Sequence, residues 1–552
     1  MTRCSLLLCA GLASLTFLAV QQASAQATPV PGAPSQAVRQ LVDKGQYADA
    51  LKLAEEGLKA APADPSLRMC QVEALLGLHR TMEARQVALS SATLGPGFRF
   101  MAGVCTAKFG RLTEAVEMWK PLYGDKDWAG PAYRESVVAL EAMGKEAEAK
   151  ALLAEALAKV PGPPASLLSL SLDLDKGLAS GKATLEKLKA VDPASASKYD
   201  ALGKVYAAAD GDLFQESVAG KLPAEITLKE KSERVEPTSL TWGGGVGGGT
   251  PGPGGGGGAA VHSSTQGYGA GTQDNSAREG GKTATMSSPP RVVVEAKING
   301  ERSEPFALDS AGSQVLITAK VAKKLNLQRL APGEYGGVGL SEPVASEWVL
   351  LKDMSVGPLH FKNVPALIID EKTEYWKETG GVIPLWMFRH YGLHYDRRHG
   401  KLTLYPSGTS PEQVLGVGAF PMKVLWFSGM PFAETRIQDK PFCYVQLATV
   451  NVGTYIEARR IADLGISLKT GQYGSQRERG LFSLIASGVA DNVALNLGPT
   501  RINLPTVLVA DLCPDREVDC VGLVGRNVLD LFDVYLDYPA NALALKGYEK
   551  GR

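Results

Sequence analysis

The chain has 552 residues, which is too long for one ordinary hydrophobic core and predicts about two to four domains. It carries 58 basic and 58 acidic side chains, so no net charge draws it toward nucleic acid, which we do not expect as a partner. No stretch after the N-terminus approaches the roughly 18 apolar residues of a spanning helix, so we expect no membrane span in the mature chain.

Residues 1–25 have the three parts of a secretory signal peptide. Arg3 supplies the positive start, residues 6–20 are mostly apolar, and Ala23-Ser24-Ala25 is a small-residue cleavage site. The sequence therefore predicts an exported protein, located in the periplasm or outside the cell.

Five cysteines remain once Cys4 and Cys9 leave with the signal peptide. Because five is odd, at least one thiol is free or pairs between chains. Cys513 and Cys520 flank a six-residue loop and form a candidate disulfide in an oxidising compartment. The pairing of three further cysteines stays open: Cys70, Cys105 and Cys443.

Residues 35–160 contain apolar-periodic segments broken by short turns, a pattern typical of helical hairpins. A six-residue pattern recurs at 45–50, 79–84, 110–115 and 144–149, and its final alanines are 34, 31 and 34 residues apart. A small alanine lets two helices approach closely, and a proline 12 residues later, present in three copies, stops the second helix.

This pattern resembles the tetratricopeptide repeat in about four degenerate copies, and an unrelated helical solenoid is the alternative. Either architecture predicts a concave groove for a protein partner. Residues 161–235 look helical without the period, and we interpret them as a helical extension. Between 243 and 258, 12 of 16 residues are glycine, so we interpret 242–290 as a flexible linker to the next domain.

From residue 291 onward the pattern indicates β-structure. A strand at 292–298 ends at Asn299-Gly300, a strong hairpin signal, and a second strand delivers Asp309 into a Ser-Ala-Gly-Ser turn. A shift of 139 residues superimposes this unit on a later one and places Asp309 on Ala448. A shift of 141 then superimposes 381–384 on 522–525. We therefore expect two similar lobes, 291–408 and 409–552.

A strand–turn–strand unit ending in Asp-Ser, a short helix and a hydrophobic-glycine loop resembles the retropepsin-like aspartic proteases. Two tandem units imply a bilobed, pepsin-like, mainly β fold after the α-solenoid. The resemblance implies peptide hydrolysis by two aspartates, one per lobe, that share a proton across a bound water. It assigns Asp309 as the candidate catalytic aspartate and Ser310 and Thr449 as loop-bracing hydroxyls, whereas Ala448 stands where the second aspartate is lost.

Three interpretations of Asp309 follow. In the first, the chain is a pseudoprotease that binds peptides or proteins without cutting them, with a further protein partner on the repeats. In the second, it is an active aspartic endopeptidase in which Asp309 of two chains meets across a homodimer. In the third, Asp309 only accepts hydrogen bonds in its turn. We favour the first, and oligomeric state and ligand identity stay open.

Other candidate sites are weaker. His390 and His394 are four residues apart with His399 beyond, but the 141-residue alignment places His390 in a helix and His394 in the next strand. Helical spacing then does not apply, so we predict no metal site and no cofactor. We interpret Trp386 and Phe388 as core residues.

Overall fold

The computed structural model describes residues 34–175, 177–231, 239–241, 283–285, 291–301, 303–335, 344–369, 379–440, 443–468, 488–510, 512 and 518–548. The predicted signal peptide (1–25), Cys513 and nearly all of the glycine-rich segment lie outside these residues. The export signal, the Cys513–Cys520 disulfide and the flexibility of 242–290 therefore stay predictions.

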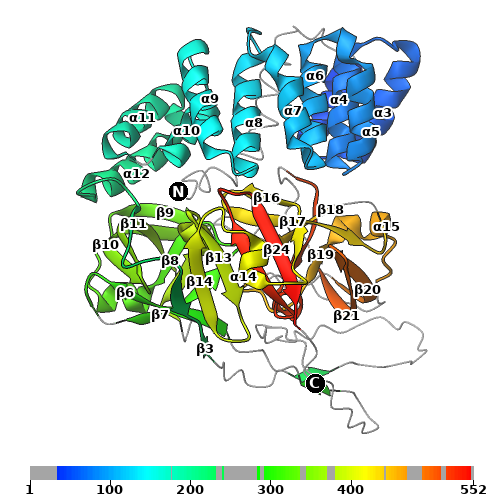
Figure 1. Ribbon diagram of the computed structural model, residues 1–552. Coiled ribbons are helices and arrows are strands. Elements are labelled where there is room, and N and C mark those ends of the chain that lie inside the picture. The colour runs from blue at the N-terminus through cyan, green and yellow to red at the C-terminus, as the bar shows by residue number, and fades with distance from the viewer. Residues whose placement is uncertain are drawn as a thin grey trace, which may run out of the picture.

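Helices build the N-terminal domain, stacked in one row above the β-structure (Figure 1). None of the described helices combines the length and the apolar character needed to cross a bilayer. In chain order they are α2 (Pro34–Asp43), α3 (Tyr47–Ala60), α4 (Pro65–Gly77), α5 (Thr81–Ser90), α6 (Pro96–Lys108), α7 (Leu112–Trp119), α8 (Ala129–Ala142), α9 (Glu146–Lys159), α10 (Ala165–Leu174), α11 (Leu178–Val191) and α12 (Ala196–Ala208).

The predicted repeat corresponds to a tight turn followed by the second helix of each hairpin. The turn residue has positive φ in every copy, and glycine holds this position in three of them. In the second copy His79 holds it, at φ 59°. The anchoring alanines are completely buried between helices: Ala50, Ala84, Ala115 and Ala149. The expected helical domain is confirmed.

Among the described residues, three large sheets make up the C-terminal module. The first has the order β1-β11-β8-β12-β7-β6-β10-β9, with β3 paired to β6. Its strands are β1 (Gln215–Val218), β3 (Lys229–Lys231), β6 (Arg291–Ile298), β7 (Glu304–Asp309), β8 (Val315–Thr318), β9 (Ala331–Tyr335), β10 (Val344–Val356), β11 (Leu359–Ile369) and β12 (Gly381–Pro384).

The second sheet has the order β16-β17-β18-β22-β19-β21-β20 and repeats the plan of the first. Its strands are β16 (Val424–Phe427), β17 (Met430–Ile437), β18 (Cys443–Leu447), β19 (Tyr455–Glu457), β20 (Gly488–Leu497), β21 (Thr500–Ala510) and β22 (Cys520–Val524). Short helices α13 (Ala319–Lys324) and α15 (Ile461–Leu464) occupy matching places in the two lobes.

The third sheet joins the lobes, in the order β15-β24-β23-β13-β14-β2. Its strands are β2 (Ala224–Thr227), β13 (Tyr391–Asp396), β14 (Lys401–Pro406), β15 (Phe420–Met422), β23 (Phe532–Asp537) and β24 (Ala542–Gly547), with α14 (Pro411–Leu415) and α16 (Arg526–Leu529) beside them. At its centre β13 of the first lobe pairs with β23 of the second, and His394 lies opposite Tyr535. These two residues are 141 positions apart, so the lobes meet through corresponding strands.

The duplicated hairpins have the same backbone geometry. Asn299 and Gly300 have φ of 51° and 74°, and Gln438 and Asp439 have φ of 52° and 58°. In each lobe the strand after this turn pairs in parallel with the hydrophobic-glycine strand, β7 with β12 and β18 with β22. The bilobed, mainly β fold class is confirmed.

The predicted helical extension over 161–235 is wrong in its last part. Helices continue to Ala208, but β1, β2 and β3 follow between residues 215 and 231. They pair with β11, β14 and β6, respectively. The first two of these partners lie more than a hundred residues away, and β6 lies directly after the glycine-rich segment. A local sequence pattern cannot predict that these three segments pair with strands elsewhere in the chain.

The glycine-rich segment also does not join the helical domain to the β-module. Strand β3 before it and β6 after it lie side by side, with Lys229 opposite Val293. The segment therefore leaves and re-enters one sheet, and the short strands β4 (Ser239–Thr241) and β5 (Thr283–Thr285) pair at its two ends. Composition predicted a flexible segment here but not the paired strands at its two ends.

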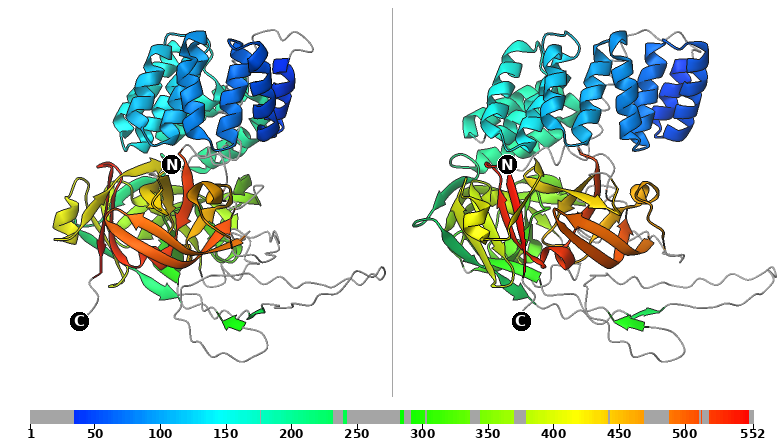
Figure 2. Two further views of the ribbon diagram at one scale, coloured as in Figure 1. Left: turned by 90° about the vertical axis from the view of Figure 1, so that its right-hand side faces the viewer. Right: turned by 45° about the vertical axis from the view of Figure 1, so that its right-hand side comes forward.

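The helical domain packs directly on the β-module (Figure 2). The apolar core of the first repeats continues into the second lobe through Leu425, Phe427, Phe432 and Tyr444. Two repeat turns also contact the module: a Cβ at Gly110 would lie 2.1 Å from Tyr444 Oη. One at Gly144 would lie 2.4 Å from the carbonyl oxygen of Tyr538. These glycines are therefore required by the interface as well as by their φ.

Candidate functional site

The carboxyl of Asp309 is buried at the end of strand β7. The residue is 2% exposed, and its Oδ1 accepts a hydrogen bond of 2.8 Å from the backbone N–H of Ala311. Burial raises the pKa of Asp309 to about 6, although the backbone N–H groups of Ala311 and Gly312 oppose that shift. A carboxyl with this pKa is largely protonated in mild acid and ionised above neutrality.

In the retropepsin-like proteases that this turn resembles, a glycine follows Asp-Ser, but here Ala311 takes that place and Gly312 comes one residue later. Ala311, in place of the first glycine, keeps the backbone N–H that faces Asp309. Gly312 provides the space, because a Cβ there would lie 3.0 Å from Asp309 Oδ2. Gly312, which has no side chain, therefore leaves the space that the Asp309 carboxyl needs in this turn.

Ser310 and Thr449 join the two lobes by reciprocal hydrogen bonds. The backbone N–H of Ser310 donates to Thr449 Oγ1 at 3.0 Å, and that of Thr449 donates to Ser310 Oγ at 2.9 Å. Ser310 Oγ donates to the Leu447 carbonyl, and Thr449 Oγ1 donates to the Leu308 carbonyl, both at 2.7 Å. All four bonds cross between the ends of strands β7 and β18. The structure thus brings together two residues that are 139 positions apart and related by the duplication.

Ala448 occupies the place that corresponds to Asp309 in the second lobe. It is 1% exposed and packs in an apolar cluster with Tyr455, Leu508 and Leu523. Ala311 of the first lobe packs against the same cluster. The side chain at the position that corresponds to Asp309 is therefore a methyl group among apolar neighbours, and it cannot share a proton with Asp309.

Two aspartates that lie near Ala448 in the sequence do not replace the missing carboxylate. The Asp439 side chain is 64% exposed at the hairpin turn and pairs with Arg501 at 2.9 Å. The Asp463 side chain is 58% exposed on α15 and pairs with Arg460 at 3.3 Å. Both belong to surface ion pairs rather than to the buried pair of turns.

Two further residues support this site, and sequence reasoning missed their roles. Trp386, correctly interpreted as core, also donates from Nε1 to the Ser313 carbonyl at 3.0 Å and so supports the turn after Asp309. Gly525 allows two backbone segments of the second lobe to approach closely, because a Cβ there would lie 2.2 Å from the carbonyl oxygen of Gly453. The hydrophobic-glycine motif was the available signal for Gly525.

The cysteines and histidines lie away from these turns. Burial raises the pKa of three thiols, Cys70, Cys105 and Cys443, to about 12 in each case. Cys520 Sγ lies 3.2 Å from the Gly522 carbonyl, and its proposed partner Cys513 is outside the described residues. His390 Nδ1 lies 2.7 Å from Glu216 Oε2, whereas His394 lies within β13, so their four-residue spacing is not helical.

Comparisons with known proteins find similarity to parts of the chain. The family model described as "Aspartyl protease" matches residues 294–400, which lie in the first lobe. No curated protein matches the sequence. Among solved structures, an aspartic proteinase from Irpex lacteus is 9% identical, with a TM-score of 0.30, covering 47% of this chain and 94% of its own.

Two other solved structures are similar to parts of the chain. Conglutin gamma, a basic 7S globulin from lupine seeds, is 9% identical with a TM-score of 0.30, covering 47% of this chain and 92% of its own. A thermophilic TPR protein from Thermus thermophilus is 22% identical with a TM-score of 0.25, covering 29% of this chain and 90% of its own. The chain combines a domain of stacked helical hairpins with a bilobed, mainly β module, and the match to the aspartyl-protease family model lies in the first lobe.

Proposed function

We propose that this protein is a pseudoprotease that binds peptide or protein segments between its two lobes without cleaving them. The observation that carries the proposal is the pairing of turns at the lobe junction. The bracing hydroxyls of Ser310 and Thr449 are both present and hydrogen-bonded, but only Asp309 has a carboxyl, because Ala448 stands in the second position.

Peptide hydrolysis by the aspartic-protease mechanism needs both carboxyls. Two carboxyls about 3 Å apart share one proton, so that one accepts a proton from water while the other donates to the substrate. Asp309 alone can hold a proton, since its pKa is raised to about 6, but the methyl group of Ala448 can neither accept nor donate one. Loss of one member of a catalytic unit usually costs orders of magnitude in rate.

The endopeptidase alternative requires Asp309 of a second chain to replace the missing carboxyl. In a homodimer of single lobes, the partner turn would approach the face that Thr449 contacts here. That face is occupied by the second lobe of the same chain, through Leu447, Thr449 and the buried Ala448. A second Asp309 could enter only after the covalently attached lobe had left. This supports binding over cleavage.

The helical domain is proposed to bind a separate protein partner, since TPR-like helices stack into an extended surface suited to protein contacts. Direct packing of this domain on the β-module would hold the two binding surfaces in one orientation. The secretory signal pattern of residues 1–25 supports action in the cell envelope or outside the cell.

The test is a peptide-library cleavage assay across the acid range up to neutrality, with and without pepstatin. The wild-type protein and Asp309→Ala should show the same background level of peptide cleavage. Ala448→Asp should gain cleavage that pepstatin inhibits, whereas Ala448→Asn, of the same size but without an acidic proton, should not.

Wild-type cleavage that is lost in Asp309→Ala would refute the pseudoprotease proposal. This comparison does not depend on the folding of either Ala448 variant. Circular dichroism identifies a variant that is inactive because the added polar group has disrupted the apolar cluster around residue 448.

A further inference from the structure

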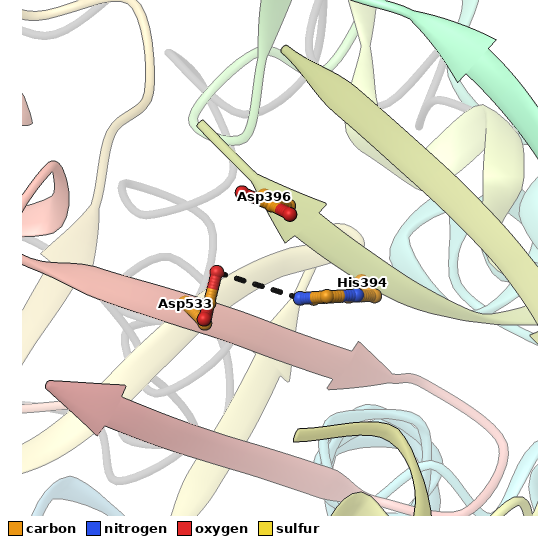
Figure 3. A group of neighbouring side chains, drawn as sticks. All are labelled: His394, Asp396 and Asp533. Atoms are coloured by element: carbon orange, nitrogen blue, oxygen red, sulfur yellow. Dashed lines mark ion pairs between the residues drawn. The ribbon is translucent and has the colours of Figure 1, made fainter. Parts of the chain in front are cut away.

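A second polar cluster lies on the sheet that joins the lobes, away from the Asp309 turn. His394 and Asp396 are two residues apart on β13 and therefore point to the same face of the sheet. Asp533 lies on β23, two residues before Tyr535, which is directly opposite His394. Asp533 thus shares this face, and Figure 3 shows the three side chains converging from the two strands.

Two atoms of this cluster are buried without a hydrogen bond. His394 Nε2 and Asp533 Oδ1 each lack a hydrogen-bond partner among the described residues and lie 3.5 Å apart. The two atoms form an ion pair, but a buried polar atom without a hydrogen bond costs about 1–3 kcal/mol, which an ion or a water bound between them would offset. Figure 3 shows the imidazole directed edge-on at the Asp533 carboxylate.

The separation of these atoms fits a shared metal ion. In a tetrahedral site with metal–ligand bonds of about 2.0–2.2 Å, neighbouring ligand atoms are about 3.3–3.6 Å apart. The atoms that His394, Asp396 and Asp533 can offer all lie within 4.8 Å of one another. Three protein ligands with a fourth position for water is a common zinc arrangement.

The surrounding groups orient the carboxylates, and the lysines on the adjacent strands form contacts elsewhere. His399 donates its backbone N–H to Asp396 at 3.0 Å, and its Nδ1 lies 2.7 Å from the same carboxylate. Lys401 and Lys546 lie opposite the two aspartates in the sheet, but Lys401 pairs with Glu225, and Lys546 donates to the Leu415 carbonyl. Tyr548 is a further neighbour of Asp533 and brings no positive charge.

We propose that His394, Asp396 and Asp533 bind one divalent transition-metal ion of the zinc class, which links the first lobe to the second. An imidazole with two carboxylates favours zinc-class ions over magnesium or calcium, which prefer oxygen ligands alone. The side chains are 13–20% exposed, so the ion can enter from solvent. The ion stabilises the central strand pair β13–β23, independently of the fate of the Asp309 site.

The test uses the full mature chain, first stripped with a chelator and then titrated with Zn²⁺ by calorimetry and with Co²⁺ by visible absorption. The wild-type protein should bind one ion per chain, show Co²⁺ bands of a four-coordinate site, and gain thermal stability. His394→Ala and Asp533→Asn should each weaken binding about tenfold or more. His360→Ala, which removes an exposed histidine on β11, is the matched control and should bind as wild type.

No binding by a folded wild-type protein would overturn the proposal. Binding that persists unchanged in both His394→Ala and Asp533→Asn would also overturn it, because the ion would then lie elsewhere. Asp533→Asn keeps the shape of the side chain, so it remains informative if His394→Ala fails to fold.

Discussion

Replacing Asp309 by asparagine should change how the stability of the protein depends on pH. The side chain is 2% exposed, and its pKa rises from 3.8 to about 6 because of burial. The folded state therefore favours the protonated carboxyl. Its contribution to stability is fully present below about pH 3.8 and is lost as pH rises through about 6. The full difference between the two limits is about 3 kcal/mol.

Asparagine does not titrate, and its side-chain oxygen can still accept the hydrogen bond from Ala311. Asp309→Asn should therefore gain about 2 kcal/mol of stability relative to wild type between about pH 4.5 and pH 8. The assay is urea denaturation of both proteins at several pH values in that range. Asp439→Asn, the same substitution at an exposed turn, controls for the change in net charge.

A difference between Asp309→Asn and wild type that stays constant with pH would refute the reasoning. It would mean that the carboxyl is hydrated in the folded protein or that its charge is compensated. The burial that defines the candidate site would then be wrong. Carbon-13 NMR of the Asp309 carboxyl measures its pKa directly and checks the result.

Three further predictions concern packing and hydrogen bonding. Thr449→Val should destabilise the protein by about 2–3 kcal/mol in urea denaturation, because two buried partners lose their hydrogen bonds, whereas Thr449→Ser should stay near wild type. Gly103→Ala should cost about 1–3 kcal/mol, because its Cβ would lie 2.2 Å from Trp119 Nε1. Gly203→Ala, in a helix with open space around it, should gain about 0.5–1 kcal/mol, and equal effects would contradict this account. Phe427→Ala, at the interface of the two domains, should cost about 3–5 kcal/mol, and a change below about 1 kcal/mol would mean that the interface is loosely packed.

The duplicated unit could be predicted from the sequence because its signals are local. The Asn299-Gly300 turn requires positive φ at two successive positions, and the corresponding turn at Gln438 and Asp439 has the same geometry. The repeat alanines were visible for a similar reason, since each marks a close helix contact within its own hairpin. Where a structural feature depends on residues that are near each other in the chain, the sequence pattern is sufficient to predict it.

The pairing of Ser310 with Thr449 was indicated only by equal positions in the two copies, and the structure supplies the four hydrogen bonds between their turns. The sequence did not predict that His394 lies close to Asp533. The spacing of histidines within the first lobe carries no information about which strand of the second lobe will lie beside them. The lack of a metal site was predicted from that spacing alone.

By itself, the sequence determined the helical repeats, the two lobes and the alignment of Ala448 with Asp309, since each is recorded in periodicity or in a direct alignment of residues. Only the tertiary structure decided that β1, β2 and β3 complete the sheets, that the glycine-rich segment returns to the sheet it leaves, and that the helical domain packs on the second lobe. These features depend on hydrogen-bonding edges and apolar surfaces contributed by distant segments. A strand edge has no partner until the fold brings one to it.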